Sequence, residues 1–176
     1  MEVETDRPAT YQSMLRAIGA FLDAQPSYHI AVAEVPDGFL LRMHRAPHIP
    51  EPMVLHVTRT ALVEQLEQLR VTKPRKPALQ PGLWSRFPNG HQDFLRALGH
   101  ELDEASAQSM LLEELEDGIV LTYRYPQPDA VVWHRRLLVL GLPEIEAILN
   151  AAFERREGKT SSRWRTEPSL RAGESV

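Results

Sequence analysis

Arginine and histidine side chains are the residues in this sequence best suited to binding chemistry. They recur on segments whose apolar and polar residues alternate as in β-strands. Guanidinium and imidazole groups gathered on one sheet face bind anionic peptides, nucleotides or nucleic-acid backbone. The alternative interpretation is an ordinary half-exposed sheet face without a ligand. The hypothesised binding residues are Arg42, His44, Arg45, His56, Arg124, His134 and Arg136, with Arg135 beside them.

Catalytic and metal-binding patterns are absent from the sequence. It contains no GxSxG, P-loop, GxGxxG, HExxH or EF-hand pattern, and its lack of cysteine excludes thiol catalysis and cysteine-based metal sites. His44 and His48 have the spacing of a helical metal pair, but Pro47 and Pro50 exclude a helix there. A zinc site in which His56 joins them is less favoured than three surface histidines. We expect no catalytic residue, no metal and no cofactor.

Acidic residues gather in two places where paired carboxylates could serve acid–base chemistry. One is the run 113–117, which leads into a predicted turn. The other consists of Glu101, Asp103 and Glu104 on one turn of a predicted helix. We interpret both groups as solvated surface charge.

Composition and net charge limit the choice of partner. Hydrophobic residues make up 43% and charged residues 25% of the 176-residue chain, as in ordinary globular proteins. The net charge is −4, so no overall positive field would attract nucleic acid or an anionic membrane. No secretory signal pattern opens the chain, and its longest near-apolar stretch, 130–142, is short and contains charged residues. We expect a cytoplasmic protein with no membrane partner.

The elements that must position these residues occur twice. When the sequence is aligned with itself so that position 8 lies opposite position 88, 12 of 38 ungapped positions from 8/88 to 45/125 are identical. We call two residues that this alignment places opposite each other counterparts. Identical counterparts include Gln12/Gln92, Gly19/Gly99, Asp23/Asp103, Glu34/Glu114 and Gly38/Gly118. Such self-similarity predicts an internal duplication.

Each copy has the predicted order helix, strand, strand, strand, helix. In the first copy, residues 11–24 have helical apolar spacing, strands are expected at 28–35, 39–45 and 53–57, and a helix at 61–70. In the second copy, strands at 110–115, 119–125 and 131–140 follow a helix near 90–102, and the closing helix is 143–156. We expect Gly38 and Gly118 to lie in the hairpin turns at positive φ.

These elements predict an α+β fold built as a tandem duplication of an α-β-β-β-α unit. The repeats are 8–70 and 88–156, joined by a proline-rich linker, 71–87, and followed by a disordered tail, 157–176. Trp84 and Phe87 should dock on the body of the protein. A unit of this size forms a marginal core, so we expect antiparallel sheets with helices on one face in a pseudo-two-fold arrangement. Alternation predicts that Arg42, His44, Arg124 and Arg136 project away from the helices.

The element order resembles that of double-stranded-RNA-binding domains. Those domains present a basic cluster at the start of their last helix, whereas both closing helices here lack lysine. Residues 84–157 also contain 13 acidic and 7 basic residues, and we reject this family. The order also resembles part of the small acidic chaperones of type III secretion, without a shared residue motif.

From the sequence we expect a non-enzymatic protein-interaction, adaptor or regulatory protein that is built as an internal pseudo-dimer. The resemblance to the type III secretion chaperones implies a chaperone-like role. Its partner is expected to be another protein, and the chain a monomer or homodimer. The alternative is an anion or nucleic-acid binder that uses the Arg/His face. An enzyme with a site between the copies is the third hypothesis.

Overall fold

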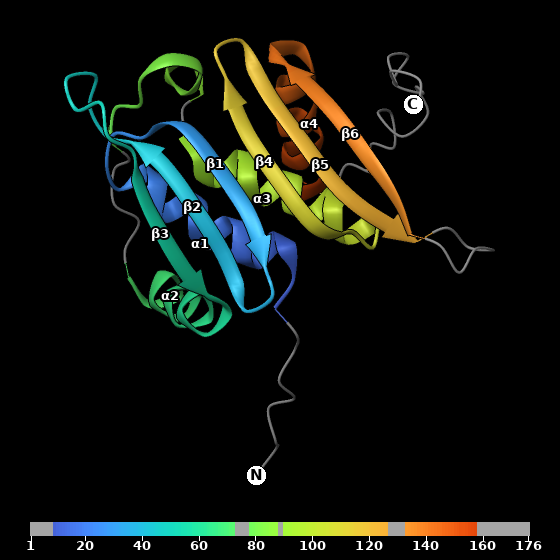
Figure 1. The fold of residues 1–176 in the computed structure, drawn as a ribbon. Coiled ribbons are helices and arrows are strands. Elements are labelled where there is room, and N and C mark those ends of the chain that lie inside the picture. Colours follow the sequence, from blue (N-terminus) through green and yellow to red (C-terminus); the bar gives the residue numbers. More distant parts are fainter. Residues whose placement is uncertain (1–8, 73–77, 88–89, 127–132, 158–176) are drawn as a thin grey trace.

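A computed structural model of the chain describes residues 9–72, 78–87, 90–126 and 133–157. These residues form one six-stranded antiparallel sheet, four α-helices and a short 3-10 helix, which confirms the mixed α+β class. The α-helices lie behind the sheet, on one of its faces (Figure 1). None of the described helices is long and apolar enough to cross a bilayer.

Both halves have the predicted element order. The first half contains α1 (Tyr11–Asp23), β1 (Tyr28–Val35), β2 (Gly38–His44), β3 (Met53–Thr58) and α2 (Arg59–Val71). The second contains α3 (Gly90–Glu104), β4 (Gln108–Leu115), β5 (Gly118–Pro126), β6 (Trp133–Gly141) and α4 (Leu142–Arg156), and η1 (Gly82–Arg86) precedes it. The segment 73–77 of the expected linker and the expected tail from 158 onward lie outside the described residues.

The two halves share one sheet, whereas the sequence led us to expect separate sheets. The strand order is β3-β2-β1-β4-β5-β6, so the halves meet where β1 pairs with β4. Val32 pairs with its own counterpart, Leu112, and Ala31 and Ala33 pair reciprocally with the counterparts of each other. This pairing satisfies backbone groups that would be exposed at the edge of a three-stranded sheet.

The core lies between the sheet and the helices. Phe39, Leu41 and Met43 alternate along β2 and are buried there, as predicted. Helices α1 and α3 pack closely at Gly19 and Gly99: a Cβ atom on Gly19 would lie 2.5 Å from the Cα of Gln92, and one on Gly99 would lie 2.6 Å from the Cα of Gln12. These contacts are again reciprocal between counterparts.

The hairpin-turn glycines differ from the prediction. Positive φ among the described glycines occurs at Gly82 and Gly90, and not at Gly38 or Gly118. A Cβ atom on Gly38 would overlap the carbonyl oxygen of Val57, and one on Gly118 would overlap that of Leu140. Glycine is therefore required at positions 38 and 118 because the backbone of the third strand of each half lies too close for a side chain. A positive φ is not the reason.

A β-bulge occurs at the same place in β1 and β4. The register shifts between Tyr28 and Ala31, and between Gln108 and Leu111. The counterparts His29 (φ 48°) and Ser109 (φ 53°) occupy the left-handed region there. Each bulge takes one backbone N–H out of the ladder, which must then find another acceptor.

Candidate interaction surface

One face of the sheet points away from the described helices (Figure 1). Directly paired residues on neighbouring strands share a face, so the strand registers define two rows across the sheet. One row is Val54, Arg42, Ala31, Glu113, Val120 and Val139. The other is His56, Leu40, Ala33, Leu111, Thr122 and Leu137. We call these twelve residues the open face.

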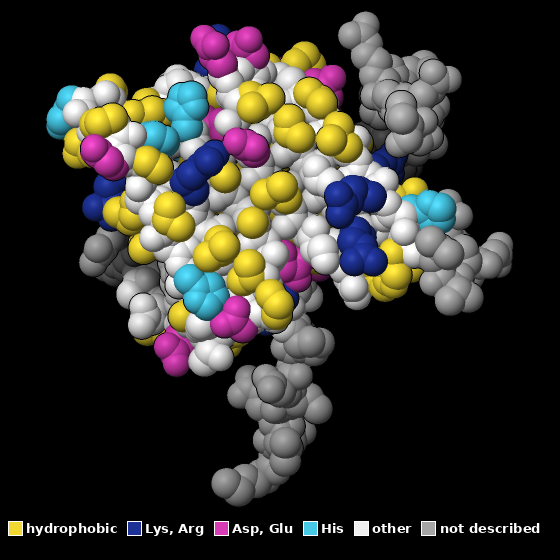
Figure 2. Space-filling model, in the orientation of Figure 1, with side chains coloured by type: hydrophobic (Ala, Val, Ile, Leu, Met, Phe, Trp, Pro, Cys, Tyr) yellow, Lys and Arg dark blue, Asp and Glu magenta, His cyan; other side chains and the backbone are white. Residues whose placement is uncertain are grey.

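The open face is rich in exposed apolar side chains. Leu40 is 41% exposed, Leu111 45%, Val54 61%, Leu137 60% and Val139 67%. Figure 2 shows hydrophobic side chains spread over the sheet, with lysine or arginine in separate places. A solvated face of an antiparallel sheet is ordinarily polar, whereas apolar patches on a surface mark sites of association.

Arg42 forms an ion pair with Glu113 near the middle of the open face. Its guanidinium lies 3.0 Å from a carboxylate oxygen of Glu113, and both side chains are about half exposed. The two residues lie on β2 and β4, on either side of Ala31 in β1. The small side chain of Ala31 leaves room for the pair to close over it. Arg42 is therefore neutralised by a residue of the other half.

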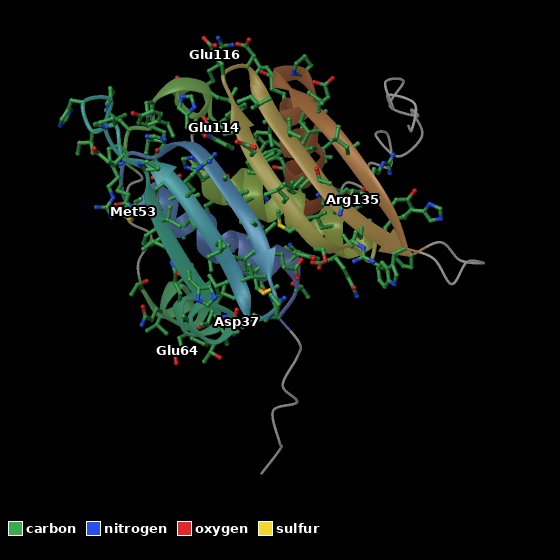
Figure 3. All side chains as sticks on the ribbon, in the orientation of Figure 1. Asp37, Met53, Glu64, Glu114, Glu116 and Arg135 are labelled. Atoms are coloured by element: carbon green, nitrogen blue, oxygen red, sulfur yellow. The ribbon has the colours of Figure 1, made fainter. Side chains whose placement is uncertain are left out.

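Arg124 and Arg135 are direct partners across β5 and β6 and lie on the same side of the sheet as the open face. The guanidinium of Arg124 lies 5.8 Å from the centroid of the Trp133 ring, within the range of a cation–π contact. In Figure 3, Arg135 lies near one edge of the sheet and Met53 near the other. Arg42 lies on β2, and strands β1 and β4 separate it from this arginine pair.

His44 and His56 lie on the first half. The imidazole of His56 lies 3.0 Å from a carboxylate oxygen of Asp37. The His44 ring contacts the rings of Tyr28 and His29, at centroid distances of 5.6 and 6.0 Å. Among the described residues, no three potential ligand side chains converge as they would around a metal ion.

Three of the predicted binding residues do not join this face. Arg136 pairs with Tyr123 and His134 with Tyr125, which places both on the helix side of the sheet, contrary to our expectation for Arg136. The Arg45 guanidinium lies 3.3 Å from the sulfur of Met53, which packs against the core. The predicted Arg/His group is therefore divided among several places.

Two aspartates that are identical counterparts, Asp23 and Asp103, join the halves. The Asp23 carboxylate accepts hydrogen bonds from the backbone N–H groups of His91 (2.8 Å) and Gln92 (2.9 Å) at the start of α3. The Asp103 carboxylate accepts from Tyr11 (2.9 Å) and Gln12 (3.0 Å) at the start of α1. Asp103 is therefore a helix cap supplied by the other half, and interpreting it as solvated charge was wrong.

Two glutamates provide the acceptors that the bulges require. Glu114 accepts from the backbone N–H of Ile30 (3.0 Å), and Glu34 accepts from that of Met110 (3.1 Å). Glu114, labelled in Figure 3, is only 7% exposed, so its interpretation as part of a solvated tip was wrong. The identity of residues 34 and 114 in the self-alignment was the signal that could have identified this role.

A cavity of about 410 Å³ lies beside the start of α1. Tyr11, Met14 and Asp103 line it together with Glu34 and Arg59. Glu34 accepts a hydrogen bond from the Tyr11 hydroxyl and one from Arg59 at 2.8 Å. Burial, and then the hydrogen bond and charge of Glu34, raise the pKa of Tyr11 above its ordinary value. The phenol therefore stays protonated and acts as a donor.

Comparisons with known protein families, with curated proteins and with solved structures find no match to this chain. The geometry described above is therefore the basis for any function assigned to it.

Proposed function

We propose that this chain is a non-enzymatic adaptor or regulatory protein that binds a protein partner through its open face. The observation that carries the proposal is the group of exposed leucine and valine side chains on the sheet face opposite the described helices. Burying apolar surface contributes about 25 cal/mol per Å², so a partner that covers these side chains gains binding energy directly. The face is joined across both halves and presents one continuous surface.

We also propose that the fold is an internal pseudo-dimer produced by tandem duplication. Three of the identical pairs bond or pack across the halves: Asp23 and Asp103, Glu34 and Glu114, Gly19 and Gly99. Reciprocal contacts of this kind are those of an isologous two-fold interface. Because these residues hold the halves together, each copy needs the same residue at the same position.

The non-enzymatic part of the proposal is supported by how the carboxylates are used. Asp23, Asp103, Glu34 and Glu114 each accept a hydrogen bond from backbone N–H groups of the other half. Groups bound in this way maintain structure and are poorly placed to exchange protons with a substrate.

The alternative is an anion or nucleic-acid binder, and one observation favours it. Arg124, Arg135 and Trp133 lie together at one end of the sheet and combine positive charge with an aromatic ring. The net charge of −4 and the pairing of Arg42 with Glu113 favour the protein partner instead.

Affinity capture with paired variants tests the proposal. The face variant is Leu137→Asp with Val139→Asp on β6. The control is Val63→Asp with Phe153→Asp, which changes apolar residues of similar exposure (43% and 55%) on helices α2 and α4. We expect one protein to be captured by the wild type and the control and lost from the face variant. Equal capture by both variants would exclude the open face as the binding surface.

A polarisation titration distinguishes the alternative. Single- and double-stranded oligonucleotides are titrated at two ionic strengths against the wild type and an Arg124→Glu, Arg135→Glu variant. Sub-micromolar binding that weakens steeply with salt and is lost in the variant would replace the protein-partner proposal, because phosphate contacts release counterions. We expect no such binding.

A further inference from the structure

The segment 78–87 docks beside the start of α3. The residues that it contacts there have counterparts that line the cavity beside the start of α1. The indole of Trp84 is 1% exposed and packs on His91 and Phe94, at ring-centroid distances of 4.3 and 5.4 Å. The counterparts of His91 and Phe94 are Tyr11 and Met14, and both line the cavity.

The hydrogen bonds that hold this segment also involve residues whose counterparts line the cavity. The Gln80 side chain accepts from the N–H of Ser27 at 2.9 Å, and the N–H of Ala78 donates to the carbonyl of Asp23 at 2.9 Å. The counterparts of Ser27 and Asp23 are Ala107 and Asp103, which also line the cavity. At one end of the paired helices a Trp-bearing segment of the chain occupies this position, and at the other end the described residues leave a cavity there.

No described residue fills the cavity as Trp84 fills the equivalent position. When the self-alignment is continued toward the N-terminus, Glu4 lies opposite Trp84, and residues 1–10 contain no tryptophan. The volume of about 410 Å³ is within the range of about 300–1,000 Å³ that small-ligand pockets have.

We propose that this cavity binds a tryptophan side chain presented on an extended segment of another protein. Three groups suit such an occupant. The Met14 sulfur can contact the edge of an aromatic ring. The Arg59 guanidinium, whose side chain is 39% exposed, lies 5.8 Å from the centroid of the Phe39 ring and 3.3 Å from the Met14 sulfur, and its opposite face can stack on the ring of the occupant. Because Glu34 is paired with Arg59, the Asp103 carboxylate gives the cavity lining a net negative charge, which favours a basic or N–H-bearing segment.

This site is separate from the open face. Tyr11 and Met14 belong to α1 and Asp103 to α3, both of which lie behind the sheet (Figure 1). A substitution that abolishes binding at one site should therefore leave binding at the other site intact. A negative result for one proposal does not decide the other.

The probe is a peptide with the chain's own docking sequence, residues 78–88, added to the full-length protein. Binding is followed by NMR through the methyl groups of Met14 and Ala107, with Val63 on α2 as a remote control. We expect saturable shifts at Met14 and Ala107, and a Trp84→Ala peptide that binds about 10-fold more weakly or worse, because it lacks the indole. Equal binding of both peptides, or no shift at Met14, would overturn the proposal.

Two further arms identify the source of the aromatic group. N-acetyl-tryptophanamide should bind much more weakly than the peptide, and equal affinity would show that the site takes a free aromatic molecule instead of a protein segment. The peptide should bind the wild type and Trp164→Ala equally. Binding only to the Trp164→Ala variant would show that the chain's own tail competes for the cavity, and would overturn an external partner.

Spin labels give an independent test of where the peptide binds. Because the chain has no cysteine, Gln108→Cys at the cavity rim and Glu146→Cys on α4 can each be labelled selectively. The label at 108 should broaden the indole resonance of the bound peptide, and the label at 146 should not. The reverse pattern would place the peptide elsewhere and contradict the proposal.

Discussion

Four carboxylates hold the two halves of this protein together, and each does so through the backbone of the other half. Asp23 and Asp103 cap the helices α3 and α1, while Glu34 and Glu114 accept the N–H groups that the bulges release. A buried N–H group without an acceptor costs about 1–3 kcal/mol, so these residues are required wherever the bulge and the close helix contact are kept.

Replacing a capping aspartate should destabilise the whole protein. Asp103→Ala and Asp23→Ala should each lower the free energy of unfolding by about 1–2 kcal/mol, because each removes a side chain that accepts two helix N–H groups. Denaturant titration measures the change. Asp117→Ala at the exposed hairpin tip is the control and should change stability by less than about 0.5 kcal/mol. Equal effects at all three positions would contradict the capping role.

The hairpin-turn glycines should reject every side chain. Gly38→Asn and Gly118→Asn should each cost more than about 1 kcal/mol, because the added Cβ atom overlaps a strand carbonyl. Gly82→Asn is the matched control: its φ is 62°, nothing lies within 4 Å of the added atom, and asparagine tolerates that conformation. Thermal melting of the three variants checks this. Tolerance of asparagine at Gly38 would favour the original prediction of positive φ.

At the level of the elements, the sequence predicted more than it did at the level of the site. Every α-helix and strand of the described residues was predicted to within a few residues, because helical and strand periodicities are strong in this chain, whereas the short 3-10 helix η1 was expected to be part of the linker. The faces of β2 and β5 also followed from alternation. In β6, charge occurs on both faces, and only the pairing of Tyr123 with Arg136 decides which side each residue takes. The alternation of apolar and polar residues within β6 does not reveal this pairing.

The contact of α1 with α3 makes its own prediction. Gly19→Ala and Gly99→Ala should each cost about 1–3 kcal/mol, because the added carbon meets helix backbone that cannot rotate away. The double variant should cost less than the sum, since either change alone already separates the same two helices. Gly141→Ala is the control, because its nearest atom is a flexible carboxylate oxygen of Glu144. Additive costs in denaturant titrations would show that the two sites are independent.

At the level of the whole molecule, the joining of two three-stranded sheets into one was not predictable from the sequence. Alternation reports which face of a strand is buried, but it does not report which edge of a sheet is paired. The identities at 23/103 and 34/114 were the available signal, and they acquire meaning only when the halves are placed edge to edge.

The shared sheet predicts that neither half unfolds alone. A calorimetric scan should give one transition whose van't Hoff and calorimetric enthalpies agree, because β1–β4 and α1–α3 join the halves through the core. Gly99→Ala, which lies in the second half, should lower the protection of β1 and β2 amides against hydrogen exchange as much as that of β4 and β5. Two transitions, or loss of protection limited to the second half, would contradict a single cooperative unit.

The open face is the central claim, and the methyl groups that form it provide its most direct test. Once a partner has been captured, it is titrated into protein whose leucine and valine methyls are labelled, at low and at high salt. We expect shifts at Leu40, Leu111, Leu137 and Val139, no shift at Val63 on α2, and an affinity that changes little with salt. Shifts confined to the helix side, or binding that disappears as the salt concentration rises, would contradict it.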